Sequence, residues 1–151
     1  MTCYPILWYI GLPIRDDTMP KQAVLIVDDE APVRATLRKF LKTLGVEEIL
    51  EASNGQEAVE SVQKAPHVKL VLLDLKMPVM DGLKTLEQIK TLLPQVKVAV
   101  LTGYPFYGEA DQAAQRWGVF DFLVKPVDLD YLERIVSVAL SEEQPGKPPQ
   151  K

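Results

Sequence analysis

The feature that most constrains the fold is a repeated alternation of short apolar runs with longer segments of helical period. Two runs, Val24–Val27 and Leu70–Leu73, are unbroken and rich in branched side chains. Such runs are typical of parallel strands that helices cover on both faces. Val96–Leu101 and Val119–Val124 are further strand candidates, and the more polar Ile49–Ala52 suits a strand at a sheet edge. The sequence therefore predicts five strands.

The segment after the first run has the pattern of an amphipathic helix. Apolar residues recur there at i, i+4, i+7, i+8 and i+11, so they share one side of a helix. These residues are Val33, Leu37, Phe40, Leu41 and Leu44. Pro32 suits the first turn of this helix and Gly45 suits its end.

Four more helices are expected. Asn54, with Glu57 three residues later, resembles a capping box that opens the second helix. The third and fourth are expected over 83–92 and 109–117, and Asp128 is a candidate N-cap for the fifth. The apolar side of the fifth helix consists of Leu132, Ile135, Val136, Ala139 and Leu140.

Five strand–helix units predict an α/β fold in which helices cover both faces of a parallel sheet. We expect one domain over residues 21–140. Residues 1–20 are expected to be an N-terminal extension, either disordered or a misassigned start, and an apolar docking segment for a partner or membrane surface is the alternative. Their apolar stretch is too short to span a membrane. Residues 141–151 read as a proline-containing tail or the stub of a linker.

Reactive side chains follow four of the five predicted strands. Asp28 and Asp29 follow the first strand, Asp74 the third, Thr102 the fourth and Lys125 the fifth. Ligands of such sheets bind at the carboxyl ends of the strands. The predicted fold therefore gathers three carboxylates, a hydroxyl and an ammonium at one edge.

Such a group of carboxylates needs cations. Two carboxylates about 5 Å apart repel by roughly 3 kcal/mol at an effective dielectric near 20. Lys125 supplies one positive charge, and a divalent ion with oxygen ligands and open positions for water and phosphate, Mg²⁺ rather than Zn²⁺, can supply more. With a metal present, a carboxylate can act as a nucleophile towards a phosphoryl group.

Four segments of the chain resemble the successive signatures of bacterial response-regulator receiver domains: VLIVDDE, LVLLDLKMPVMDG, VLTGY and FDFLVKP. They occur in the family's order, over about residues 21–140. The resemblance, to a chemotaxis-regulator-like single domain, implies a flavodoxin-like, doubly wound (βα)5 sandwich with strand order 2-1-3-4-5. It also implies two-component signalling in the cytoplasm.

By position in these motifs, the resemblance makes Asp74 the phosphoacceptor and one of the residues that hold Mg²⁺. Asp29 matches a direct Mg²⁺ ligand, Asp28 a carboxylate that holds the metal mainly through water, and the backbone carbonyl of Lys76 completes the protein's share of the coordination. Thr102 and Lys125 match the residues that contact the phosphoryl oxygens. Phe122 matches the switch aromatic that turns inward when Thr102 moves.

The resemblance further implies a sensor histidine kinase or phosphotransfer protein as the phosphodonor. The chain would catalyse only its own phosphorylation and dephosphorylation, and would not be an enzyme in the ordinary sense. The output surface would comprise the fourth helix, the fifth strand and the fifth helix, where the family docks effectors or dimerises. The effector, and whether a phosphorylation-dependent homodimer forms, are left open by the sequence.

Other function classes fit less well. A net charge of −4 and a pI of about 5.1 argue against direct contact with nucleic acid. An aspartyl phosphatase would want a carboxylate two residues after its nucleophile, where this chain has Lys76. A receiver-like adaptor that is never phosphorylated is the main alternative, and the complete set of acidic residues with Thr102 and Lys125 counts against it.

Overall fold

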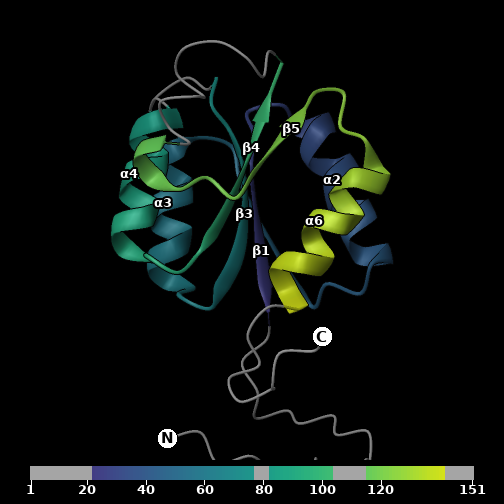
Figure 1. Ribbon diagram of the computed structural model, residues 1–151, viewed down its shortest axis with the longest axis horizontal. Coiled ribbons are helices and arrows are strands. Elements are labelled where there is room, and N and C mark those ends of the chain that lie inside the picture. The colour runs from purple at the N-terminus through teal and green to yellow at the C-terminus, as the bar shows by residue number, and fades with distance from the viewer. Residues whose placement is uncertain (1–21, 77–81, 104–114, 142–151) are drawn as a thin grey trace, which may run out of the picture.

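A single sheet of five parallel strands, in the order β2-β1-β3-β4-β5, forms the centre of the molecule (Figure 1). The structure is a computed structural model that describes residues 22–76, 82–103 and 115–141. The strands are β1 (Ala23–Val27), β2 (Glu48–Ala52), β3 (Val68–Asp74), β4 (Lys97–Thr102) and β5 (Asp121–Val124). The predicted fold class and strand order are confirmed.

Helices cover both faces of the sheet. Helices α3 (Gly55–Lys64) and α4 (Gly82–Leu92) lie on one face, and α2 (Ala31–Thr43) and α6 (Leu129–Ser141) lie on the other (Figure 1). Each face has its own apolar core, because alternate side chains of the central strands point to opposite faces. Among the described residues, no helix combines the length and apolar character that a membrane crossing requires.

Burial of the strands follows the sequence pattern. Every residue of β1 is fully buried, and β3 is buried except at one position. The edge strands β2 and β5 are mostly half-buried or exposed. The continuous apolar runs therefore mark two of the three interior strands, and the polar Ile49–Ala52 run marks an edge, as predicted.

The predicted helix ends are largely confirmed. Pro32 lies in the first turn of α2, and Gly45, with φ of 83°, follows the C-cap residue Leu44. The Asn54 side chain accepts a hydrogen bond from the backbone N–H of Glu57 (2.9 Å). The Glu57 carboxylate, however, accepts from the N–H of Ser53 (2.8 Å), one residue before the N-cap residue to which a standard capping box returns.

Helix α6 begins as expected at Asp128, whose Oδ1 accepts from the N–H groups of Asp130 (2.9 Å) and Tyr131 (3.2 Å). It ends at Ser141, one residue beyond the predicted domain. The helix expected over 109–117 is described only at 115–117, which are helical, and the extension at 1–20 lies outside the described residues.

Strand β5 is shorter than predicted. The sequence pattern began at Val119, whereas the strand begins at Asp121. Phe120 still donates its N–H to the Val98 carbonyl (2.8 Å), and both Val119 and Phe120 pack against the apolar cores. Their apolar character therefore reflects burial in the approach to the strand, which periodicity cannot separate from the strand itself.

The strand order creates a switch point between β1 and β3. The chain leaves β1 through α2 on one face of the sheet, and it leaves β3 towards α4 on the other face (Figure 1). The loops that follow these two neighbouring strands therefore diverge, and such a divergence opens a crevice at the carboxyl end of the sheet.

Gly82 brings helix α4 close to the chain that leaves β3. A Cβ at Gly82 would lie 2.4 Å from the Cα of Leu75 and 2.6 Å from its carbonyl oxygen. Both are backbone atoms, which a rotamer change cannot move. Only glycine therefore allows the first turn of α4 to pack directly beside the residue that follows Asp74.

We predict that Gly82→Ala lowers the free energy of unfolding by about 2–4 kcal/mol, because backbone segments must separate to relieve the overlap. Urea denaturation followed by circular dichroism measures the loss. Gly103→Ala is the matched control, because no described atom lies within 4 Å of its Cβ position. Equal stability of the two variants would contradict the prediction.

Candidate functional site

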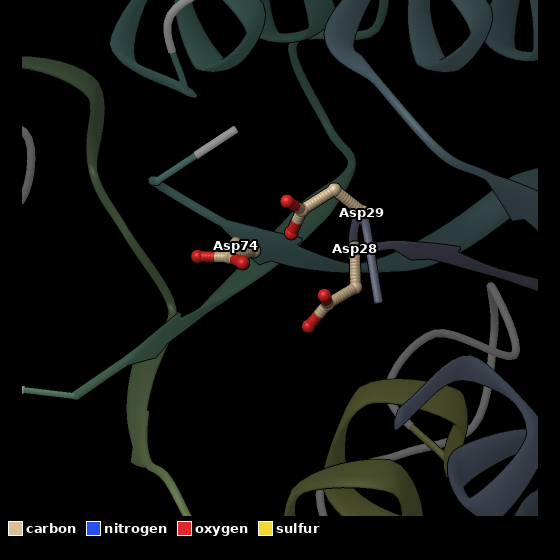
Figure 2. A group of neighbouring side chains, drawn as sticks. All are labelled: Asp28, Asp29 and Asp74. Atoms are coloured by element: carbon tan, nitrogen blue, oxygen red, sulfur yellow. The ribbon is translucent and has the colours of Figure 1, made fainter. Parts of the chain in front are cut away.

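Three carboxylates meet at the switch point. Val27 of β1 pairs with Leu73 of β3, so the next residues along these strands, Asp28 and Asp74, leave the sheet side by side. Asp29 follows in the loop after β1. Figure 2 shows the three carboxyl groups gathered at the ends of the two strands, and one oxygen from each lies within 4.8 Å of the others.

Lys125, which directly follows the edge strand β5, brings a positive charge to this cluster. Its Nζ lies 2.8 Å from Oδ2 of Asp28, 3.1 Å from Oδ2 of Asp74 and 3.6 Å from Oε1 of Glu30. The backbone N–H of Lys125 donates to the Thr102 carbonyl (2.8 Å). The ends of β4 and β5 are thus joined, and the lysine is held where it reaches β1 and β3.

Burial and charge oppose each other at Asp74. The residue is only 5% exposed, and burial raises the pKa of its carboxyl group above the ordinary value. The N–H of Lys76, which donates to Oδ1 (2.9 Å), and the Lys125 ammonium partly offset this rise in pKa. Burial by itself lowers the pKa of Lys125, but the carboxylates of Asp28 and Asp74 raise it to about 12. The ammonium therefore stays charged at all physiological pH values.

Asp28 is fully buried and has one unsatisfied oxygen. Oδ1 accepts from the N–H of Glu30 (2.9 Å). Oδ2 is the one buried side-chain nitrogen or oxygen atom, within the part of the chain that the structure describes, that lacks a hydrogen-bond partner. The Lys125 ammonium is close enough for an ion pair with it but does not meet hydrogen-bond geometry.

This donor set fits a hard divalent cation. All three candidate ligands are carboxylates, their oxygens lie close together, and one oxygen of Asp28 has no hydrogen-bond partner. Mg²⁺ is bound in proteins by one or a few carboxylates and keeps several waters. Asp29 is exposed, which leaves the cluster open to solvent on one side.

The remaining predicted site residues are Thr102, Lys76 and Phe122, which lie on or after β3, β4 and β5. Thr102 is half-buried at the end of β4, in register with Val124. Lys76 contributes its N–H to Asp74, while the role expected for its carbonyl stays a prediction. Phe122 is half-buried in β5 opposite Val100, and the structure does not place it within the acidic cluster.

Two residues of the site were missed by sequence reasoning. Glu30 continues the run of acids after β1 and approaches Lys125. Arg34, in the first turns of α2, donates from Nη1 to the carbonyl oxygen of Asp28 (2.7 Å). The sequence feature that could have identified Arg34 is its position. It follows Val33 of the apolar stripe of α2, near the start of the helix that comes after β1.

Comparison with known proteins finds one family across most of the chain. The model for the response regulator receiver domain matches residues 24–137. The transcriptional regulatory protein ZraR of Klebsiella oxytoca is 36% identical over 126 residues, which are 83% of this chain and 28% of that protein. The autoinducer 1 sensor kinase/phosphatase LuxN of Vibrio campbellii is 41% identical over 113 residues, 75% of this chain and 13% of that protein.

Solved structures agree with this match. The response regulator TrrA of Thermotoga maritima, solved in complex with Mg²⁺ and BeF, aligns with a TM-score of 0.69 and 31% identity, over 78% of this chain and 98% of that one. The chain thus spans less than a third of the two curated relatives, but it covers nearly all of this solved structure.

We predict that Asp74→Asn stabilises the metal-free protein at neutral pH. The folded-state pKa of Asp74 is raised by burial, so ionisation of this carboxyl group disfavours the folded state. The penalty is complete above the folded pKa and is lost as the pH falls to the unfolded value near 3.9. Urea denaturation in the presence of a chelator from pH 7 to pH 4 should show a gain for Asp74→Asn that shrinks on acidification.

Glu87→Gln is a suitable control, because it removes one negative charge from an exposed position on α4. Its difference from the parent protein should change little over the same pH range. A pH-independent difference between Asp74→Asn and the parent would contradict the prediction.

Proposed function

The chain belongs to the family of response regulator receiver domains, and we propose that it is a phosphorylation switch whose phosphoacceptor is Asp74. The observation that carries this proposal is the cluster of Asp28, Asp29 and Asp74 around the Lys125 ammonium. Asp74 is the last residue of a central strand, and its carboxyl group lies beside those of Asp28 and Asp29 (Figure 2).

A divalent cation belongs to this proposal. Asp28, Asp29 and Asp74 would hold it together with the backbone carbonyl of Lys76, and Mg²⁺ fits this set of oxygen ligands. When bound, Mg²⁺ supplies positive charge that stabilises the negative oxygens of a transferring phosphoryl group.

The chemical step requires a carboxylate nucleophile and a charged partner for the phosphoryl oxygens. One oxygen of Asp74 attacks the phosphorus of a phosphohistidine on the partner protein. The new O–P bond forms as the N–P bond breaks, and the electron pair returns to the imidazole nitrogen. The N–H of Lys76 holds Oδ1 of Asp74, and the Lys125 ammonium lies where it can pair with a phosphoryl oxygen.

Lys125 connects this chemistry to the switch. Its ammonium is shared between Asp28 and Asp74. A phosphoryl group adds a charge of about −1.5 to −2, and it would compete for the ammonium and for the Thr102 hydroxyl. The N–H of Lys125 donates a hydrogen bond to the Thr102 carbonyl. Movement of either residue would therefore displace the ends of both β4 and β5, and Phe122 lies in β5.

The output surface that we propose comprises the helix expected over 109–117, strand β5 and helix α6. Most of that first helix lies outside the described residues. On the other two elements, large apolar side chains are exposed at Val124 (45%), Leu129 (38%) and Val138 (45%). Exposed apolar side chains on neighbouring elements suit contact with an effector or with a second copy of the chain.

The phosphodonor that we propose is a cytoplasmic sensor histidine kinase or a phosphotransfer protein. ZraR is a transcriptional regulatory protein and LuxN a sensor kinase/phosphatase, so receiver domains of this kind occur in proteins with different outputs. The domain limits we propose are 21–140, which enclose the family match. We propose no activity of this chain on an external substrate.

We predict that the parent protein gains one phosphoryl group when incubated with acetyl phosphate and Mg²⁺, and that Asp74→Asn gains none. Intact-mass spectrometry measures the gain. Asp130→Asn, an exposed aspartate in the first turn of α6, is the matched control and should behave as the parent. A parent protein that is never modified would favour the alternative of a receiver-like adaptor that works without phosphorylation.

We also predict that Mg²⁺ stabilises the parent protein, by about 2.7 kcal/mol at a concentration of 100 times Kd, because only the folded state brings the three carboxylates together. Thermal unfolding at constant ionic strength measures this gain. Asp29→Asn should lose most of it, whereas Asp130→Asn should keep it. An equal gain for both variants would place the cation elsewhere.

A further inference from the structure

We infer that Arg34 is a positioning residue that fixes the Asp28–Asp29 peptide and so sets the geometry of the acidic cluster. The inference rests on the proposed function, because it concerns the cation that the cluster would hold. Arg34 lies on α2 and does not reach the carboxylates, so its effect is exerted through the backbone of the loop that carries two of them.

The contact of Arg34 with this loop is short and shielded from water. Nη1 donates to the carbonyl oxygen of Asp28 at 2.7 Å, and the arginine side chain is only 19% exposed. A hydrogen bond from a charged donor is about twice as strong as one between neutral groups. The rest of the guanidinium is held from the opposite side, where Nε lies 3.5 Å from Oε1 of Glu51 on β2.

Each polar group of Asp28 except one has a hydrogen-bond partner within the protein. Its N–H donates to the Ala52 carbonyl (3.1 Å), its carbonyl accepts from Arg34, and its Oδ1 accepts from the N–H of Glu30 (2.9 Å). Only Oδ2 lacks one, and it faces Lys125 at 2.8 Å. The protein thus holds the backbone of Asp28 on both sides, and its Oδ2 is the one oxygen that no hydrogen bond fixes.

The carbonyl of Asp28 and the N–H of Asp29 belong to one planar peptide unit. A fixed carbonyl oxygen therefore fixes the plane of this peptide and the direction in which the Asp29 side chain leaves the backbone. Asp29 is exposed, so its orientation depends on the loop backbone more than on packing. Without Arg34, the loop would have to be ordered when the cation binds, and that entropic cost would weaken binding.

Arg38 offers a matched control within the same network. It lies one turn later on α2, pairs with Oε2 of Glu51 (3.1 Å) and donates from Nη1 to a backbone carbonyl, that of Ile49 on the edge strand (3.3 Å). It makes the same kinds of contact as Arg34 but touches no residue of the acidic cluster. A purely structural role for the network predicts similar effects from the loss of either arginine.

The test compares Arg34→Ala, Arg38→Ala and Arg34→Lys with the parent protein. Mg²⁺ affinity is measured by calorimetric titration at a temperature where urea denaturation shows every variant to be folded. Residues that orient metal ligands typically change affinity 10–100-fold, so we expect Arg34→Ala to raise Kd about tenfold. Arg38→Ala should stay within about twofold of the parent, and Arg34→Lys, which keeps a cationic donor, within about threefold.

A second readout needs no cation. Amide hydrogen exchange in metal-free protein, followed by NMR, reports on the N–H groups of Asp28 and Glu30, which donate within the loop and to β2. Both should exchange faster in Arg34→Ala than in Arg38→Ala.

The two readouts separate the possible failures. If Arg34→Ala binds Mg²⁺ as tightly as the parent, or if Arg38→Ala weakens binding equally, the positioning role is wrong. The same holds if Arg34→Lys is as weak as Arg34→Ala. If the parent binds no Mg²⁺, the proposed function fails, and hydrogen exchange alone decides whether Arg34 orders the loop: equal exchange in the two alanine variants refutes it.

Discussion

The ion pairs of Lys125 with Asp28 and Asp74 are the interactions on which the rest of the site depends. Two buried carboxylates at neighbouring strand ends repel each other, and burial further disfavours their charge. One ammonium, 2.8 Å and 3.1 Å from their oxygens, compensates part of this charge. The compensation is incomplete, since one ammonium faces two buried carboxylates and a third, that of Asp29, lies beside them. The cluster therefore keeps an excess of negative charge, which the cation of the proposed function would balance.

The sheet makes this arrangement possible because it places the ends of separate strands at one edge. Parallel pairing of β1 with β3 puts Asp28 beside Asp74, and pairing of β4 with β5 puts Lys125 beside Thr102. Helices that follow β1 and β3 lie on opposite faces, so the loops after these two strands diverge at their carboxyl ends (Figure 1). Gly82 then allows the first turn of α4 to pack against the chain just after Asp74.

Much of the fold could be predicted because burial and periodicity are local properties of the sequence. The unbroken runs of β1 and β3, the apolar stripe of α2 and the Asp128 cap of α6 all appear in the structure where the pattern placed them. The errors arose where one local signal has two physical causes. Val119 and Phe120 are apolar because they pack, partly buried, against the cores before β5 begins, and Glu57 returns to Ser53 because that N–H lies within reach.

The sequence by itself determined the fold class and the chemical types of side chain at the strand ends, because residues next to each other in the chain carry both signals. It also identified the family, through motifs that lie within short segments. Only the tertiary structure decided which atoms meet: that Lys125 is shared between two aspartates, that Oδ2 of Asp28 is left unsatisfied, and that Arg34 holds the Asp28 carbonyl. These contacts depend on strand register and on helix placement, which are set by packing over the whole sheet and leave no local pattern in the sequence.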